Sequence, residues 1–96
     1  MTEDELLTGL TDALTLAGWT WTHIRRSDGI TMGNAGLPDI IAVKAGHPML
    51  LWELKSQHGS ITPDQMGWLL AAQDVRVQTA IVRPDGYDAA LAVILG

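Results

Sequence analysis

Hydrophobic residues recur every three or four positions near the start of the chain, which predicts a helix there. Thr2 is a suitable N-cap, and Glu5 follows three residues later, as in a capping box. Gly18 ends this pattern, whose apolar members are Leu6, Leu7, Leu10, Ala13, Leu14 and Ala17. Residues 19–26 then alternate loosely and carry Trp, Thr and Ile, which indicates a strand. The glycine-rich residues 27–36 predict a loop.

Two apolar stretches in the middle of the chain predict a β-hairpin. Residues 37–43 and 49–55 flank a short turn at residues 45–48. The first stretch is entered through Pro38, which is tolerated at the first residue of a strand because no ladder donor is missed there. The second stretch is apolar on both faces until its end. That pattern is typical of a central strand covered on both sides.

A second helix is predicted to begin at Thr62, with Pro63 in the first helical position and Gln65 completing another capping box. It extends to about residue 73. A fourth strand over residues 76–82 and an apolar helix over residues 87–95 follow. The order is αβββαβα, and strands three and four should be parallel because a helix connects them. We therefore expect one α/β domain over residues 1–96, with a mixed four-stranded sheet flanked by helices.

The composition indicates what kind of protein this domain is and excludes several classes of site. The chain has 96 residues, of which 47% are hydrophobic, so either its core is well packed or a partner covers some apolar surface. The absence of cysteine excludes disulfides and thiolate metal sites. The start of the chain is acidic, and no apolar run approaches the roughly 20 residues needed to span a bilayer. We expect a soluble, cytoplasmic protein that does not enter a membrane.

The net charge of −5 disfavours tight binding to nucleic acid, because DNA-binding proteins usually neutralise phosphates with a basic patch. Clustering of the cations, bound metal ions or dimerisation would have to supply what the composition lacks. The six basic residues are Arg25, Arg26, Lys44, Lys55, Arg76 and Arg83.

The residues most suggestive of chemistry are Asp39, Glu53 and Lys55. Side chains alternate along a strand, so Glu53 and Lys55 point to the same face. In a hairpin, the start of one strand lies beside the end of the other, so Asp39 should lie near Glu53. Two carboxylates and a lysine suit Mg²⁺-assisted phosphodiester hydrolysis. The alternative is a solvated strand end and an ordinary turn residue.

The motif Pro38-Asp39…Glu53-Leu54-Lys55 resembles the PD-(D/E)xK signature of the restriction-endonuclease-like superfamily. More narrowly, the chain resembles the stand-alone VRR-NUC nucleases common in phages. The resemblance implies a restriction-endonuclease-like core of order αβββαβ(α). Its further matching elements are Thr2-Glu3, Gly18-Trp19, His23 with Ser27, Gly36-Leu37, Trp52, Gly59, Ile61-Thr62, Gln65 with Trp68, and Arg83-Pro84.

The resemblance implies that Asp39 and Glu53 bind Mg²⁺, or Mn²⁺ in its place, with the backbone carbonyl of Leu54 as a further ligand. Lys55 would be the catalytic lysine, and Gln65 would join the catalytic group. Glu3 would reach the metal through water. Local alternatives remain for both Gln65 and Glu3, because a capping box and a first-turn acid are sufficient structural reasons for them.

Arg25, Arg26 and His23 are candidate DNA-binding residues. The two arginines adjoin the glycine-rich loop, and a solvated strand end is their alternative role. A strand histidine is more often structural, and His23 forms no metal-binding spacing with the other histidines. The four tryptophans are interpreted as core or dimer contacts rather than base-stacking platforms.

The resemblance implies a metal-dependent DNA endonuclease, selective for structures such as the Holliday junction and acting as a homodimer. A two-fold dimer with two sites would match paired symmetric cuts in a branched DNA. A nuclease directed to flaps or nicks is the nearer alternative. A catalytically inactive DNA-binding or assembly subunit is the other. If phage-encoded, the protein would act in the cytoplasm of a bacterial host.

Overall fold

The sheet and helices expected from the sequence are present in a computed structural model, which describes residues 1–24, 32–73 and 76–96. The elements follow one another as α1 (Glu3–Leu16), β1 (Thr20–His23), β2 (Ile40–Val43), β3 (Met49–Leu54), α2 (Pro63–Ala72), β4 (Val77–Val82), the 3₁₀ turn η1 (Pro84–Gly86) and α3 (Tyr87–Leu95). No helix in the described part of the chain is long and apolar enough to cross a membrane.

The four strands form one mixed sheet in the order β1-β2-β3-β4. The pairs β1–β2 and β2–β3 are antiparallel, and β3–β4 is parallel, as the sequence predicts. In the hairpin, Ile40 lies opposite Trp52. In the parallel pair, Leu54 lies beside Val82. The carboxyl ends of β3 and β4 therefore meet at the same edge of the sheet.

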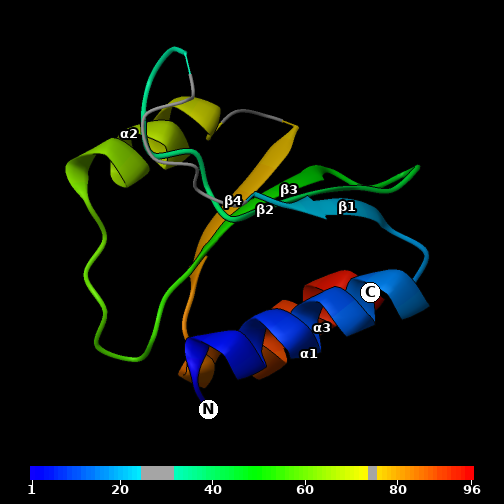
Figure 1. Cartoon of the computed structure of the whole chain (residues 1–96). Coiled ribbons are helices and arrows are strands. Elements are labelled where there is room, and N and C mark those ends of the chain that lie inside the picture. The colour runs from blue at the N-terminus through cyan, green and yellow to red at the C-terminus, as the bar shows by residue number, and fades with distance from the viewer. Residues whose placement is uncertain (25–31, 74–75) are drawn as a thin grey trace.

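Helices α1 and α3 pack together on one face of the sheet, and α2 covers the other face (Figure 1). The larger apolar core lies on the side of α1 and α3, and its strand residues include Leu50, Trp52 and Leu54. The side chains of Leu51 and Glu53 alternate with these and are also buried. Strand β3 is thus covered on both sides, which confirms its prediction as a central strand.

Both predicted capping boxes are formed. The Thr2 hydroxyl accepts a hydrogen bond from the Glu5 amide at 3.1 Å, and the Glu5 carboxylate accepts one from the Thr2 amide at 2.8 Å. The side chains of Thr62 and Gln65 make the equivalent pair at 3.2 and 2.9 Å. These bonds satisfy amide groups that have no partner within their helix.

The predicted start of β1 is one residue early, for a reason at the end of α1. The Trp19 amide donates to the Leu14 carbonyl at 2.9 Å and the Gly18 amide to Thr15 at 3.2 Å. With Gly18 at φ 83°, these bonds form a Schellman motif. The Trp19 amide is therefore used by the helix end and not by the sheet.

The predicted start of β2 at residue 37 is also wrong, since the strand begins at Ile40. Pro38 has no amide hydrogen to donate to a ladder. Gly36, at φ 95°, has a backbone conformation outside the strand region. The chain therefore reaches Asp39 as a bend, and the Asp39 carbonyl accepts a hydrogen bond from the amide of Ile24, just after β1, at 2.7 Å.

Candidate active site

Glu53 is a buried acid near the carboxyl end of β3, with a relative exposure of 1%. Its Oε2 accepts a hydrogen bond from Gln65 Nε2 at 2.9 Å. The same oxygen lies 3.3 Å from the ammonium of Lys55. Strand alternation places Glu53 and Lys55 on one face, and these contacts offset part of the cost of burying a carboxylate.

Gln65 joins helix α2 to that acid through the two ends of its amide. Its Oε1 accepts from the Thr62 amide at 2.9 Å, which closes the capping box, while its Nε2 donates to Glu53. The capping role considered for Gln65 is therefore formed, and the same amide also contacts Glu53. Because Gln65 is 1% exposed, its orientation is fixed by burial as well as by these bonds.

Asp39 lies at the bend before β2, and its side chain contacts β3. Its Oδ2 accepts a hydrogen bond from the Leu54 amide at 2.8 Å. The pairing of Ile40 with Trp52 brings the next position, Asp39, alongside Glu53 at the same sheet edge. The structure thus brings Asp39 to the segment that carries Glu53 and Lys55, with the Leu54 backbone between them.

A cavity of about 110 Å³ lies beside Asp39 on the side of α1. Glu3 and His23, the less specific candidates from the sequence, share this cavity with Asp39. Its lining residues are Glu3, Asp4, Leu7, His23, Asp39 and Leu54. Glu53, Lys55 and Gln65 do not line it.

Within the described ranges, no three His, Asp or Glu side chains are grouped so that they could hold a metal ion together. A metal at this edge would therefore need backbone oxygen and water ligands besides the carboxylates of Asp39 and Glu53. That donor set fits Mg²⁺, which takes one or two carboxylates and keeps several waters.

Gly36 allows the loop before Asp39 to lie directly against the start of α2. A Cβ atom at Gly36 would fall 2.5 Å from the Asp64 carbonyl carbon and 2.7 Å from the Gln65 amide nitrogen. Backbone atoms at these distances cannot move aside as a flexible side chain can. Glycine at this position therefore permits the close contact between the Asp39 loop and the helix that carries Gln65.

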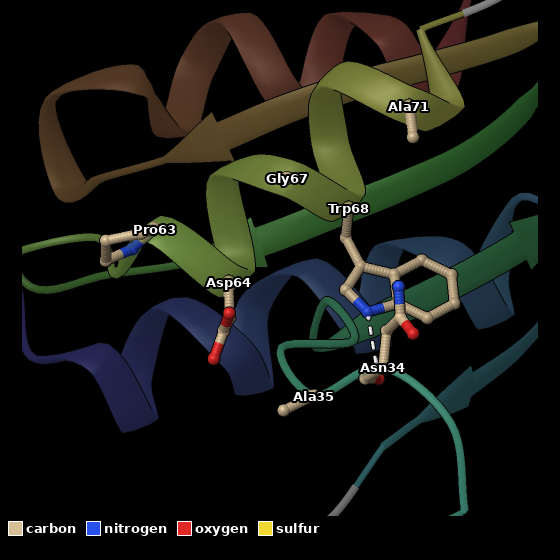
Figure 2. Close-up of a pocket in the computed structure, with 7 residues that line it drawn as sticks. All are labelled: Asn34, Ala35, Pro63, Asp64, Gly67, Trp68 and Ala71. Atoms are coloured by element: carbon tan, nitrogen blue, oxygen red, sulfur yellow. Dashed lines mark hydrogen bonds between the residues drawn. The ribbon is translucent and has the colours of Figure 1, made fainter.

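A larger cavity, of about 400 Å³, lies between the same loop and α2 (Figure 2). The Trp68 side chain points from the helix toward the loop, and its Nε1 donates to the Asn34 carbonyl at 3.2 Å (Figure 2). Trp19 and Trp52 are buried, in agreement with their interpretation as core residues, whereas Trp68 is partly exposed. The glycine-rich loop and a helical tryptophan were the available sequence signals, but neither specifies a cavity.

Of the predicted DNA-binding residues, Arg25 and Arg26 lie outside the described residues, and His23 lines the smaller cavity. The sequence also left Arg83 without a role. Its Nη1 donates to three backbone carbonyls of the loop that follows Lys55. The acceptors are Ser56 at 2.9 Å, Gln57 at 3.4 Å and Gly59 at 2.7 Å.

No family model matches the sequence, and neither does any curated protein. The fold is similar to a solved structure described as a VRR_NUC domain, with a TM-score of 0.69 and 12% sequence identity. The similarity covers 96% of this chain and 97% of the other. At this identity the likeness concerns the fold, and it confirms the predicted α/β class with its restriction-endonuclease-like core.

Proposed function

We propose that this chain is a metal-dependent nuclease that hydrolyses phosphodiester bonds in DNA. The observation that carries the proposal is the joining of Asp39 to β3 beside Glu53, with Lys55 and Gln65 both on the Glu53 carboxylate. An ordinary solvated strand end would not bury Glu53 to 1% exposure. The fold of a VRR_NUC domain supports the same assignment.

The metal in this proposal is Mg²⁺, with Mn²⁺ able to replace it. The carboxylates of Asp39 and Glu53 and the Leu54 backbone carbonyl would hold it, and Glu3 would contribute through water. When bound, the ion lowers the pKa of a coordinated water and neutralises charge that develops on the phosphate. The remaining steps belong to the side chains.

Among the residues that the structure describes, Lys55 places a positive charge beside the Glu53 carboxylate. Its ammonium, 3.3 Å from Glu53 Oε2, is suited to orient the attacking water and to stabilise the charge of the pentavalent transition state. Gln65 holds the Glu53 carboxylate in place through its bond of 2.9 Å. The Leu54 amide does the same for Asp39 at 2.8 Å. Positioning of this kind restricts the groups to reactive geometries.

The preferred substrate in this proposal is branched DNA, such as a Holliday junction, cut by a homodimer. Two copies would provide two equivalent sites, which fits paired symmetric cuts. Flap and nicked DNA belong in the same substrate panel, and solution mass measured alongside tests the dimer. A strict monomer that cuts flaps and leaves junctions intact would replace the junction specificity with the flap specificity.

The test of the chemistry uses labelled junction, flap and linear duplex DNA with Mg²⁺, with Mn²⁺, and with EDTA. We expect metal-dependent cleavage that Asp39→Ala and Lys55→Ala reduce on the order of 10³-fold. Asp12→Ala and Lys44→Ala are matched controls, because Asp12 is exposed on α1 and the Lys44 ammonium donates to the Ala17 carbonyl at 2.6 Å. Binding without cleavage of any substrate would support the inactive-subunit alternative.

A further inference from the structure

Arg83 is a cation held in place at the sheet edge where the candidate active site lies. It directly follows β4, whose last residue Val82 lies beside Leu54. The Lys55 amide donates to the Val82 carbonyl at 3.0 Å. Since neighbouring strands are about 4.8 Å apart, Arg83 leaves the sheet one strand away from Glu53 and Lys55.

One nitrogen of the Arg83 guanidinium is committed to the loop after Lys55. Nη1 donates to three backbone carbonyls of residues 56–59, the shortest bond being 2.7 Å to Gly59. Arginine carries five N–H donors on three nitrogens in a rigid plane. Anchoring through Nη1 therefore holds the other two nitrogens in a fixed orientation.

Those other two nitrogens, Nε and Nη2, have no hydrogen-bond partner among the residues that the structure describes. The three acceptors of Nη1 are neutral carbonyls, and Arg83 forms no ion pair within the described ranges. Its positive charge is therefore not cancelled by a carboxylate there. Its side chain is half-buried, so solvent and ligands still reach part of it.

The cations with which Arg83 can be compared are used differently. The Lys55 ammonium is paired with Glu53, and the Lys44 ammonium donates to the Ala17 carbonyl. Arg76 is exposed just before β4 begins, at the opposite end of that strand. Arg83 thus combines a fixed side chain, an uncompensated charge and a place at the sheet edge of the candidate site.

We propose that Arg83 binds a backbone phosphate of the DNA, next to the phosphate that is cleaved, and so positions the strand over Glu53 and Lys55. This inference rests on the proposed nuclease function. A guanidinium matches the paired oxygens of a phosphate through two parallel N–H bonds. Contacts of this type fix the register of DNA on a protein without reading its sequence.

The loop should keep its shape without Arg83 because a second clamp holds it. Gln57 Nε2 donates to Asp85 Oδ2 at 2.9 Å, and the Asp85 amide donates to Gln57 Oε1 at 3.1 Å. Substitution of Arg83 therefore leaves one of the two attachments between residues 56–59 and the end of β4.

The test is the salt dependence of DNA binding, measured without divalent metal for the wild type, Arg83→Gln, Arg83→Lys and Arg76→Gln. Each phosphate contact contributes about −0.9 to the slope of log K against log salt concentration. We expect Arg83→Gln to reduce the slope by about 1 and to weaken binding on the order of tenfold. Arg83→Lys should keep the slope, and Arg76→Gln should match the wild type.

A purely structural Arg83 gives another pattern, with lower thermal stability for Arg83→Gln and Arg83→Lys alike and an unchanged slope. That result, or equal slope changes for Arg83→Gln and Arg76→Gln, would overturn the inference. Wild-type protein that binds DNA but cleaves none of it argues against the nuclease function, while the slopes still decide the role of Arg83. Wild-type protein that binds no DNA at any salt concentration overturns both.

Discussion

Replacement of Gln65 by leucine should destabilise the protein because one amide serves two partners. Its oxygen accepts from the Thr62 amide and its nitrogen donates to Glu53 Oε2, both at 2.9 Å. Leucine is similar in size but offers neither bond. Since Glu53 is 1% exposed, water cannot easily replace the lost donor.

The magnitude follows from the two bonds. A hydrogen bond to a charged group contributes about 1.5–3 kcal/mol. Loss of a helix-capping interaction costs roughly 1 kcal/mol. Burial of the more apolar leucine offsets part of this, roughly 1 kcal/mol. We therefore expect Gln65→Leu to lower the free energy of unfolding by about 1.5–3 kcal/mol.

Urea denaturation measures this change, and Gln57→Ala is a suitable control. Gln57 also makes two hydrogen bonds through its amide, both with Asp85, but it is exposed. Exposed bonds are exchanged for bonds to water, so we expect a loss below about 1 kcal/mol. Equal losses for Gln65→Leu and Gln57→Ala would refute the argument that burial of Glu53 sets the magnitude.

Gln65→Glu isolates the contact with Glu53, because glutamate also completes a capping box. Burial and the neighbouring carboxylate should raise the pKa of the introduced carboxyl group above its unfolded value. An acid with a raised pKa is compatible with the folded state only while it is protonated. The stability deficit relative to the wild type should therefore be small near pH 4 and grow as the pH rises to about 8. A deficit independent of pH would contradict the close placement of the two side chains.

Three further predictions concern other residues. In urea denaturation, Gly36→Ala should lower the free energy of unfolding by roughly 3 kcal/mol and Gly46→Ala by about 1–2 kcal/mol. Both glycines have a positive φ, but only at Gly36 would the added Cβ lie 2.5 Å from a backbone atom. Equal losses for the two variants would contradict this close contact. Gly67→Ala should stabilise α2 by about 1 kcal/mol, since nothing lies within 4 Å of its Cβ; destabilisation would show that something fills this space. Hydrogen bonds with Thr2 lower the pKa of Glu5, so the contribution of Glu5 to stability is lost as the pH falls through that lowered value. The stability of Glu5→Gln should therefore fall less than that of the wild type below about pH 5. Identical stability profiles in acid would contradict this prediction.

The sequence predicts best those features that depend on neighbours along the chain. Both capping boxes involve residues three apart, and both are formed. The alternation of β3 correctly places Glu53 and Lys55 on one face, because side-chain period in a strand is a local property. The hairpin follows from a short turn between two apolar stretches.

The features that the sequence does not predict depend on contacts between distant elements. Arg83 reaches the Gly59 carbonyl across 24 positions. Gln65 reaches Glu53 across 12, and only the family resemblance, not the local pattern, points to a place for it in the site. The sequence predicts too early a start for β2 because the close approach of Gly36 to α2 has no local signal. Leu37 and Pro38, which follow Gly36, match the pattern of a strand start when only local spacing is considered.

The acidic composition shows how far a formal charge count is from a description of a binding surface. The count gives Lys44, Lys55 and Arg83 equal weight in the net charge of −5. The structure separates them. A carboxylate lies 3.3 Å from Lys55, and a backbone carbonyl binds Lys44. Among the described residues, neutral carbonyls hold one nitrogen of Arg83 and leave the other two without a partner. A phosphate responds to the local field rather than to the sum of charges. If Arg83 supplies that field, the acidic residues elsewhere in the chain are compatible with DNA binding at this edge of the sheet.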